Sequence, residues 1–421
     1  MAEEALLNDE FLRQLMNVGE VDIVVGLPTY NNLKTIEPVV RAIQAGILKC
    51  FPRERVVIID ADGGSQDGTR DLVTGISIDD VWRASKVYAL RTLPVIFTRY
   101  GHGPEPRVAL RTILSAADLL RARACVIISP DSTTIETDWL QRLVLPIYKD
   151  GFDLVSPVYR RQKFAGLLMR NLLYPMIRAV YGSGLREPYA SEFAISGHLA
   201  TDFLGNEGWH GDGARSGPEM FLTIMAITGK YKMCQSFLGD KPAQDRGADL
   251  VDAMRRTVGA LFASLDVQFQ YWSAVTSCQQ VPAFGPQPEV TLEPVTVDLA
   301  RIREMFVNGV AELDAVFKSV LRDSTLAELQ RIAALDLNNF RYPAEVWAKT
   351  VFEFAASYHQ SVISRDHIVQ ALVPLYRGRA LSFLLENQDT PAEEVERSVE
   401  TLCGEFERLK PYLLKVWAER K

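Results

Sequence analysis

Residues 56–69 read VVIIDADGGSQDGT, a run of aliphatic residues followed by acids and a glycine-rich polar turn. Four aliphatic residues in a row predict a strand that is buried on both faces, as in a parallel sheet covered by helices. Ligands bind at the carboxyl ends of such strands, where Asp60, Asp62 and the turn at 63–65 are expected to lie. The next helix opens at residues 67–69, and free amide groups at a helix start favour anions. The alternative interpretation is a capped turn that binds no ligand.

Strands alternate with helices along the first half of the chain. Aliphatic runs predict further strands at residues 21–27, 95–98, 126–129 and 153–157, with helices in the intervals before the last of them. This alternation predicts an α/β fold with a Rossmann-like, mostly parallel sheet that is flanked by helices.

The chain falls into parts of different composition, and its 421 residues are too many for one ordinary core. The N-terminus reads as an acidic amphipathic helix with Leu12, Leu15 and Met16 on one side. Four prolines between residues 281 and 296 indicate a linker. We predict an N-terminal helix at 1–20, an α/β domain at 21–280, a linker at 281–296 and an all-helical domain at 297–421. Helices are expected there at 298–321, 325–335, 343–358, 364–375, 378–386 and 391–418.

Composition excludes several classes of function. A content of 48% hydrophobic and 24% charged residues is that of a soluble globular protein. A net charge of −7 argues against nucleic acid or an anionic membrane as the main partner, because both need a basic surface. The 5 cysteines are scattered, which predicts reduced thiols in a cytoplasmic protein. No run approaches the roughly 18 apolar residues that span a bilayer, so no integral membrane segment is expected.

Polar residues follow three of the predicted strands. They are residues 28–32, residues 60–64 and Asp131, and they converge if the sheet is parallel. Such an edge can cradle a nucleoside and its diphosphate. A diphosphate needs positive charge, and a divalent cation held by a carboxylate is the usual source, so Asp131 is the expected ligand of Mg²⁺ or Mn²⁺. Its alternative role is that of a helix cap or turn acid.

The chain resembles the GT-A nucleotide-sugar glycosyltransferases, and among them the glucosyl-3-phosphoglycerate synthase and glucosylglycerate synthase group. The residues that carry the resemblance are PTYNNLKTIEPVV at 28–40, DGGSQDGT at 62–69, VYRR at 158–161 and YASEFAIS at 189–196. It extends over about residues 20 to 250. The resemblance implies a GT-A fold and a nucleoside diphosphate hexose as donor.

The resemblance also implies a donor site. The family's DxD motif overlies Ser129, Pro130 and Asp131, so that its first acid is replaced by serine. The family's later metal-binding histidine is absent, and Asp240, Gln244 or Asp245 would take its place if a metal binds. Arg107 or His102 would replace a lysine of the loop over the diphosphate, and Lys241 or Arg246 would neutralise phosphate directly. The expected donor-binding residues are Pro28, Thr29, Tyr30, Asn31, Asn32, Asp62, Gly63, Ser129, Asp131 and Lys241.

The acceptor site is expected beside the end of the fifth strand. Arg160, Arg161 and Lys163 form a cationic cluster suited to a carboxylate or phosphate, unless it is only a solvated run. The family's glyceryl-binding turn is not matched at Gly166, so Lys163 or Arg170 is expected to act in its place. Glu192 and Glu219 match acids that the family places near the reacting sugar. The residues expected to carry catalysis are Asp131, Glu219 and Arg107.

The function implied is retaining transfer of a hexose, glucose first, to glycerate or 3-phosphoglycerate, which would yield a glucosylglycerate-type compatible solute. In this scheme the leaving diphosphate accepts the acceptor's proton on the same face of the sugar. The alternatives are mannosyl transfer, a polysaccharide or lipid acceptor, and a non-catalytic relative that binds a sugar nucleotide. A homo-oligomer formed through the helical domain also stays open.

Overall fold

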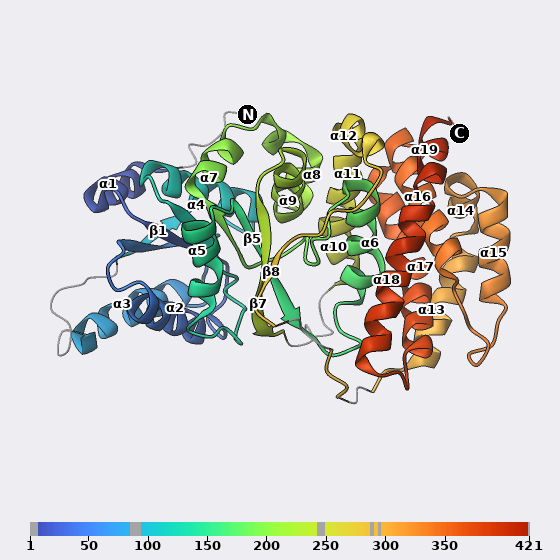
Figure 1. Cartoon of the computed structure of the whole chain (residues 1–421), viewed down its shortest axis with the longest axis horizontal. Helices are drawn as coiled ribbons and strands as arrows, with labels where there is room; N and C mark the ends of the chain where they lie inside the picture. Colours follow the sequence, from blue (N-terminus) through green and yellow to red (C-terminus); the bar gives the residue numbers. More distant parts are fainter. Residues whose placement is uncertain (1–6, 85–93, 242–248, 287–289, 294–295, 420–421) are drawn as a thin grey trace.

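The computed structural model describes residues 7–84, 94–241, 249–286, 290–293 and 296–419. An 8-stranded sheet with its helices forms one part of the molecule, and a bundle of helices forms the other (Figure 1). The strands are β1 (Ile23–Thr29), β2 (Val56–Asp62), β3 (Val95–Arg99), β4 (Ala124–Ile127), β5 (Leu154–Arg160), β6 (Phe193–Ser196), β7 (Met233–Asp240) and β8 (Ala283–Phe284).

The sheet has the order β3-β2-β1-β4-β6-β5-β7-β8. All its pairings are parallel except those that β6 makes with β4 and β5. The predicted α/β fold with a mostly parallel sheet is therefore confirmed, and β1 to β5 lie within a few residues of their predicted places. Because β6 runs in the opposite direction, the residues just before it lie at the same edge as the residues that follow β4 and β5.

Helices cover both faces of the sheet, and β2 shows why. Val57 and Ile59 pack into one core, whereas Val56 and Ile58 pack into the other. The strand is therefore buried on both faces, as its unbroken aliphatic run predicts. The first core is completed by α1 (Asp9–Val18), α4 (Pro106–Leu119), α7 (Gly197–Leu204) and α9 (Pro218–Thr228), and the second by α2 (Ile36–Cys50), α3 (Thr69–Ala84) and α5 (Trp139–Asp150).

The N-terminal helix packs through only part of the predicted side, since Leu15 is buried as expected and Met16 is not. Asn8 caps α1, and Phe11 and Leu15 are its buried residues, whereas Met16 is 81% exposed. The apolar stripe of α1 therefore runs through Phe11, which precedes the predicted set by one position.

The helical part begins before the predicted linker. The segment after β5 forms π-helical turns at Met169–Leu173 and Ile177–Tyr181 around α6 (Tyr174–Met176). Between the turn at Glu207–His210 and the linker lie α8 (Asp212–Ser216), α10 (Leu250–Met254), a π-helical turn at Arg255–Gly259, α11 (Ala260–Val267) and α12 (Phe269–Ala274). After the linker follow α13 (Leu299–Glu312), α14 (Asp314–Val320), α15 (Asp323–Ala333), α16 (Ala344–Gln360), α17 (Arg365–Glu386), α18 (Ala392–Arg408) and α19 (Lys410–Ala418).

The predicted C-terminal helices exist, but three boundaries were wrong. The first and last predicted helices each break once, at Leu313 and Leu409. The two helices expected at 364–375 and 378–386 form one helix, α17, which contains Pro374. A Cβ added at Gly309 of α13 would lie 2.3 Å from Cβ of Pro374, so this glycine lets the two helices approach closely. The break expected at residues 376 and 377 does not occur, because Tyr376 is buried in the core together with the rest of the helix.

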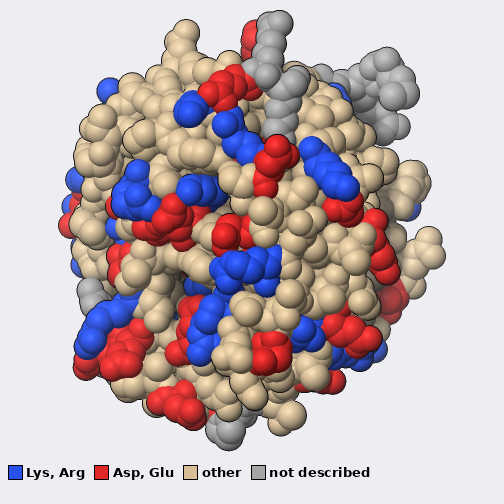
Figure 2. All heavy atoms as spheres, turned by 90° about the vertical axis from the view of Figure 1, so that its right-hand side faces the viewer, with Lys and Arg blue, Asp and Glu red and all other residues tan. Residues whose placement is uncertain are grey.

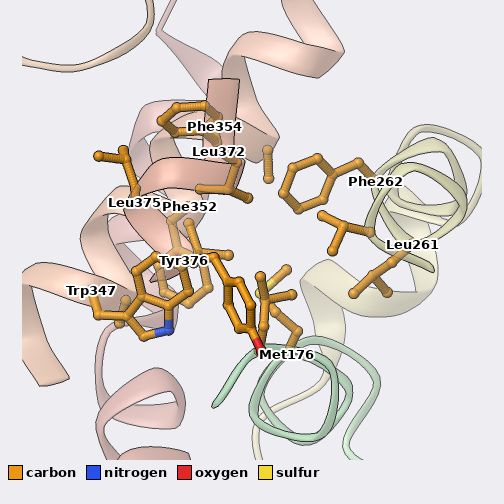
Figure 3. Packing of buried hydrophobic residues seen from close by; sticks show 14 of the residues in the cluster. Met176, Leu261, Phe262, Trp347, Phe352, Phe354, Leu372, Leu375 and Tyr376 are labelled. Carbon is orange, nitrogen blue, oxygen red and sulfur yellow. The ribbon is translucent and has the colours of Figure 1, made fainter. Parts of the chain in front are cut away.

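One core joins the two parts of the chain. Figure 3 shows Met176 beside Tyr376 of α17, and the α11 residues Leu261 and Phe262 belong to the same hydrophobic cluster as Trp347 of α16. The division at 281–296 stays a prediction, and the hydrophobic core crosses it. Part of the expected linker also belongs to the sheet, because β8 pairs with β7.

Helix α17 is long and apolar enough to cross a membrane by length and composition, which the sequence analysis did not foresee. In the structure 83% of its most apolar window is buried inside the protein. It is therefore a core helix of this fold, and no other helix within the described ranges passes the same test. On the face shown in Figure 2, acidic and basic side chains are interspersed, as on an ordinary solvated surface.

Candidate active site

A buried network of side chains joins the carboxyl ends of β1 and β2. Thr29 Oγ1 lies 2.6 Å from Asp60 Oδ1 and 3.3 Å from Asp62 Oδ1. Asp62 Oδ2 accepts hydrogen bonds from the N–H groups of Gly64 (2.8 Å) and Ser65 (2.9 Å), and Asp62 Oδ1 accepts one from the Ser65 hydroxyl. Charge-assisted bonds to backbone N–H groups are strong, so Asp62 fixes the glycine-rich turn that follows β2.

Gly63 lies where the loop after β3 crosses the site. A Cβ added at Gly63 would lie 2.6 Å from the carbonyl oxygen of Gly103, 2.9 Å from Tyr100 Oη and 3.0 Å from Tyr30 Cδ2. These distances leave room for glycine alone. The expected donor residues Tyr30 and Gly63 are therefore brought together beneath the loop at residues 100–105.

Asn31 links the turn after β1 to the turn after β2. Its φ of 54° lies in the left-handed region, which asparagine adopts more readily than most residues. Its N–H donates to Ser65 Oγ at 2.8 Å, and its Oδ1 accepts from the N–H of Gln66 at 3.0 Å. Pro28 precedes Thr29 within β1, so all of residues 28–32 lie at this edge of the sheet.

A single carboxylate joins the residues after β4 to those after β1. Asn32 Nδ2 donates to Asp131 Oδ1 at 2.9 Å, and Thr35 Oγ1 donates to the same oxygen at 2.7 Å. The N–H of Asp131 lies 3.3 Å from Ser129 Oγ. Within the part of the chain that the structure describes, Asp131 Oδ2 has no hydrogen-bond partner. Three strand ends therefore meet at one edge of the sheet, and an exposed carboxylate oxygen is open there.

Glu192, just before β6, ties this edge to the other half of the sheet. It is 1% exposed, and its carboxylate accepts from Ser132, from Tyr159 Oη at 2.6 Å and from Lys241 Nζ at 2.8 Å. Both carboxylate oxygens are thereby engaged. Because Ser132 follows Asp131 directly, Glu192 helps to fix the loop that carries Asp131.

Glu192 forms an ion pair with Lys241, and this pair keeps the buried acid charged. Burial by itself would raise the pKa of Glu192, but the charge of Lys241 and the hydrogen bonds from Lys241, Ser132 and Tyr159 outweigh it and hold the pKa below its usual value. Lys241 Nζ also lies 4.5 Å from the centre of the Tyr159 ring. The expected donor cation is thus neutralised by a buried acid.

Asp240 and Arg160, at the ends of β7 and β5, pair with each other. Arg160 binds both carboxylate oxygens of Asp240, with 2.8 Å between Nη2 and Oδ2, and both side chains are about half exposed. The expected second metal ligand is therefore engaged by an arginine, and Asp245 lies outside the described residues. No group of three or more His, Cys, Asp or Glu side chains within the described ranges is placed to hold a metal ion.

The other expected acceptor cations face the helical part of the chain. Arg161 makes a bidentate, largely buried pair with Glu187 at 2.9 Å. Lys163 Nζ donates to the carbonyl oxygens of residues 387 and 388, and Arg170 Nη1 donates to the carbonyl of Lys163 at 3.0 Å. Arg161 and Arg170 also line a cavity of about 40 Å³, which has room for roughly one or two waters. The structure thus separates Arg160 from the rest of its cluster.

Arg107 and Glu219 lie on helices that start at this edge of the sheet. Arg107 Nη1 donates to the carbonyl oxygen of Trp209 at 3.3 Å. Glu219 lies in the first turn of α9, and its Oε2 is buried without a hydrogen-bond partner among the described residues. Burial raises the pKa of Glu219, although the charge of Arg256 and a hydrogen bond with Tyr189 oppose the shift. A buried acid with an unused oxygen is a group that a bound hydroxyl can satisfy.

Three residues of this site escaped the sequence analysis, namely Thr35, Ser132 and Tyr159. Thr35 precedes α2, but its hydroxyl makes no cap of that helix and binds Asp131. Ser132 and Tyr159 each flank a residue that was identified, and only their common partner Glu192 reveals their place. Their position in the sequence could have indicated them, because polar residues next to strand-end residues lie at the same edge of the sheet.

Comparison with known proteins found similarity of structure alone. No protein-family model matches the chain, and no curated protein matches it. The chain is structurally similar to glucosyl-3-phosphoglycerate synthase from Mycobacterium tuberculosis, with 19% identity, 63% of this chain and 85% of that chain covered, and a TM-score of 0.40.

Two complexes of the same enzyme give similar values. In the complex with phosphoglyceric acid the identity is 20%, the coverage 60% of this chain and 82% of that chain, and the TM-score 0.43. In the complex with Mn²⁺, uridine diphosphate and glucosyl-3-phosphoglycerate the identity is 20% and the TM-score is 0.42. The match covers 63% of this chain and 85% of that chain. At such values the likeness says nothing about substrates or residue roles.

Proposed function

We propose that the chain is a hexosyltransferase that uses a nucleoside diphosphate hexose as donor and a small anionic acceptor. The observation that carries this proposal is the meeting of Asn32, Thr35 and Asp131 beside the turn that Asp62 fixes. Polar groups from three strand ends at the carboxyl edge of a parallel sheet form a nucleotide cleft. The turns after β1 and β2 would hold the nucleoside, and Asp131 would face the diphosphate.

A divalent cation would bind at this edge of the sheet through Asp131. One carboxylate together with substrate phosphates and waters is a donor set that Mg²⁺ accepts, and Asp131 Oδ2 is open. A bound cation would supply positive charge to the leaving diphosphate. Asn32 and Thr35 would orient the carboxylate for that task, because both hold its other oxygen. Catalysis would rest on positioning and on neutralising the leaving group, and the leaving diphosphate would accept the acceptor's proton.

The acceptor's anionic group would bind at Arg160. The pair of Arg160 and Asp240 is exposed, and such pairs contribute little to stability, so a carboxylate or phosphate can replace Asp240. The pair of Arg161 and Glu187 is buried and would not open at low cost. Glu219, with its unused oxygen, would accept a hydrogen bond from a hydroxyl of the sugar or the acceptor. Glycerate or 3-phosphoglycerate as acceptor, glucose as the hexose, retention of configuration and a cytoplasmic location complete the proposal.

A second candidate function is sugar-nucleotide binding without transfer. Two observations favour it: serine stands where the family's first metal-site acid is expected, and Asp240 is occupied by Arg160. Both reduce the negative charge available to hold a cation.

A matrix of donors and acceptors distinguishes the two functions. UDP-glucose, GDP-glucose and GDP-mannose would each be incubated with glycerate and with 3-phosphoglycerate, and product would be followed by mass spectrometry. One pair is expected to give product, and EDTA is expected to lower its rate by at least about 10²-fold, as loss of a charge-stabilising group does. Addition of Mg²⁺ or Mn²⁺ should restore the rate. Nucleotide binding without any product would instead support the second candidate.

Substitution of Arg160 tests the acceptor assignment. Arg160→Ala is expected to raise the acceptor's KM by about tenfold or more, the value of a hydrogen bond to a charged group, and to leave the donor's KM unchanged. Arg41→Ala, which removes an exposed pair with Glu37 on α2, is the matched control. Arg161→Ala should lower thermal stability, because it leaves Glu187 buried without its partner. An acceptor KM that Arg160→Ala does not change would remove Arg160 from the site.

A further inference from the structure

Asp60 is a fully buried acid that the proposed reaction does not use. Its side chain is 0% exposed, and its Oδ1 lies 2.6 Å from Thr29 Oγ1. The same hydroxyl oxygen lies 3.3 Å from Asp62 Oδ1. Within the described ranges the other oxygen of Asp60, Oδ2, is buried and has no hydrogen-bond partner. Two carboxyl groups therefore flank one hydroxyl beneath the turn that follows β2.

The number of protons available to Thr29, Asp60 and Asp62 decides which of the two acids is protonated. Thr29 has one hydroxyl proton and can donate it to only one of them. If both acids were ionised, the other carboxylate would face the lone pairs of the Thr29 oxygen. Asp62 accepts three further hydrogen bonds, from Gly64, Ser65 N–H and the Ser65 hydroxyl, whereas Asp60 has Thr29 alone. The acid that needs an additional proton is therefore Asp60.

We propose that Asp60 holds a proton on Oδ1 and donates it to Thr29, whose own hydroxyl proton is donated to Asp62. Asp60 is then a positioning residue: as a neutral acid, it sets the hydroxyl that supports the carboxylate of the turn at residues 62–65. When Asp60 loses its proton, Thr29 turns its hydroxyl to Asp60, and Asp62 loses one donor. The turn is then held less tightly.

The surroundings of Asp60 agree with a neutral acid. Burial, assisted by the negative charge of Asp62, raises the pKa of Asp60 to about 7, although the hydrogen bond from Thr29 and the charge of Arg70 oppose the shift. Arg70 on α3 lies 4.2 Å from the ring centre of Phe97 and makes no ion pair with Asp60 among the described contacts. The remaining groups that bear on Asp60 are few. Among the described residues they comprise the phenol of Tyr100 after β3, which interacts with Asp60 through charge.

The sign of the effect on stability follows from linkage. An unfolded aspartate has an ordinary pKa of 3.8, below that of Asp60 in the folded chain. The folded state therefore binds more protons between about pH 4 and pH 7, so the free energy of unfolding falls as the pH rises through that window. Above it the contribution is constant. Asparagine at this position has an N–H donor at every pH and contributes no such slope.

The test compares Asp60→Asn with the unchanged chain by thermal unfolding between pH 5 and pH 8.5. The Tm difference in favour of Asp60→Asn is expected to grow by about 3 °C or more from the lowest to the highest pH. Asp71→Asn, which removes an exposed acid of α3, should follow the unchanged chain at each pH. Parallel Tm profiles for the chain and Asp60→Asn would overturn the proposal. If Asp60→Asn does not fold, ¹³C NMR of aspartate carboxyl groups in the unchanged chain should find one that titrates near pH 7, and its absence would also overturn it.

A second readout rests on the proposed function, because the turn at 62–65 is there assigned to the nucleotide. The affinity for UDP is expected to fall from pH 6.5 to pH 8.5 by at least about threefold more in the unchanged chain than in Asp60→Asn. Equal loss in the two proteins would contradict the link between Asp60 and this turn. If neither protein binds UDP while the Tm profiles still diverge, the proposed function is contradicted. The protonation of Asp60 is then still supported.

Discussion

Asp131→Ala is expected to lower the rate of hexosyl transfer by at least about 10²-fold, measured as kcat/KM for the donor, and to leave the fold intact. Removing one group that stabilises developing charge has an effect of this size in other enzymes. Asp131 offers the open carboxylate oxygen where three strand ends meet, and Asn32 and Thr35 hold the other oxygen in place. Its side chain is exposed, so its loss should change Tm by no more than about 2 °C.

Two further variants show which property of Asp131 matters. Asp131→Asn keeps an oxygen that accepts from Asn32 and Thr35 but removes the charge. If Asp131 holds a cation, the asparagine variant should be as impaired as the alanine variant and should need more Mg²⁺ or Mn²⁺ for its residual activity. Glu136→Ala removes an exposed acid of the same loop and is expected to keep full activity. Undiminished turnover in Asp131→Ala would end the assignment of this edge as the active site.

The sequence predicts the sheet well wherever a strand is long and aliphatic. β2 is buried on both faces because all its residues before Asp60 are aliphatic, and its position follows from that run alone. The strands that were not predicted lack such a run: β6 reads FAIS, β7 contains Gln235 and Ser236, and β8 has only two residues. The helical boundaries were misjudged where one residue packs against a distant neighbour, as Gly378 does against Phe306.

The site could be predicted in its placement but not in its pairings. Residues that follow parallel strands must share an edge, so the nearness of Asn32 and Asp131 follows from topology. Which cation meets which acid depends on chain segments far apart in sequence. Lys163 binds carbonyl groups more than 220 residues away, and Arg160 binds Asp240, 80 residues away. No local pattern distinguishes such engaged cations from cations that are open to a substrate.

Glu192→Ala is expected to lower the free energy of unfolding by about 3 kcal/mol, because removing one partner of a buried ion pair leaves the other charge uncompensated. The side chain of Lys241 is 18% exposed, so water can relieve part of this cost, and the lower end of the usual range applies. Tyr159 and Ser132 lose their acceptor as well. Urea unfolding measures the change, and Asp118→Ala, which removes the acceptor of the exposed Thr201 hydroxyl, is a matched control with a small expected effect.

A double variant separates the loss of charge balance from the loss of packing. In Glu192→Gln the amide oxygen can still accept from Tyr159 or Ser132, but Lys241 lacks a counter-charge. Adding Lys241→Met removes the uncompensated cation, so the double variant should be more stable than Glu192→Gln alone. A double variant that is less stable than the single one would show that the pair does not dominate.

The pH dependence of the stability of Glu192→Gln shows whether Glu192 is ionised in the folded chain. The pKa of Glu192 in the folded chain lies below the ordinary value of 4.5, so the pair stabilises the fold fully above that pH and ceases to do so as the pH falls through the folded pKa. The stability difference between the unchanged chain and Glu192→Gln should therefore be constant at neutral pH and shrink under more acid conditions. Because Glu192 holds Ser132, which adjoins Asp131, Glu192→Gln should also lower the transfer activity at neutral pH. The kcat is expected to fall, and the acceptor KM is expected to stay unchanged. A difference in stability that grows on acidification would mean that Glu192 is protonated in the folded protein, and Lys241 would then be free to bind the diphosphate.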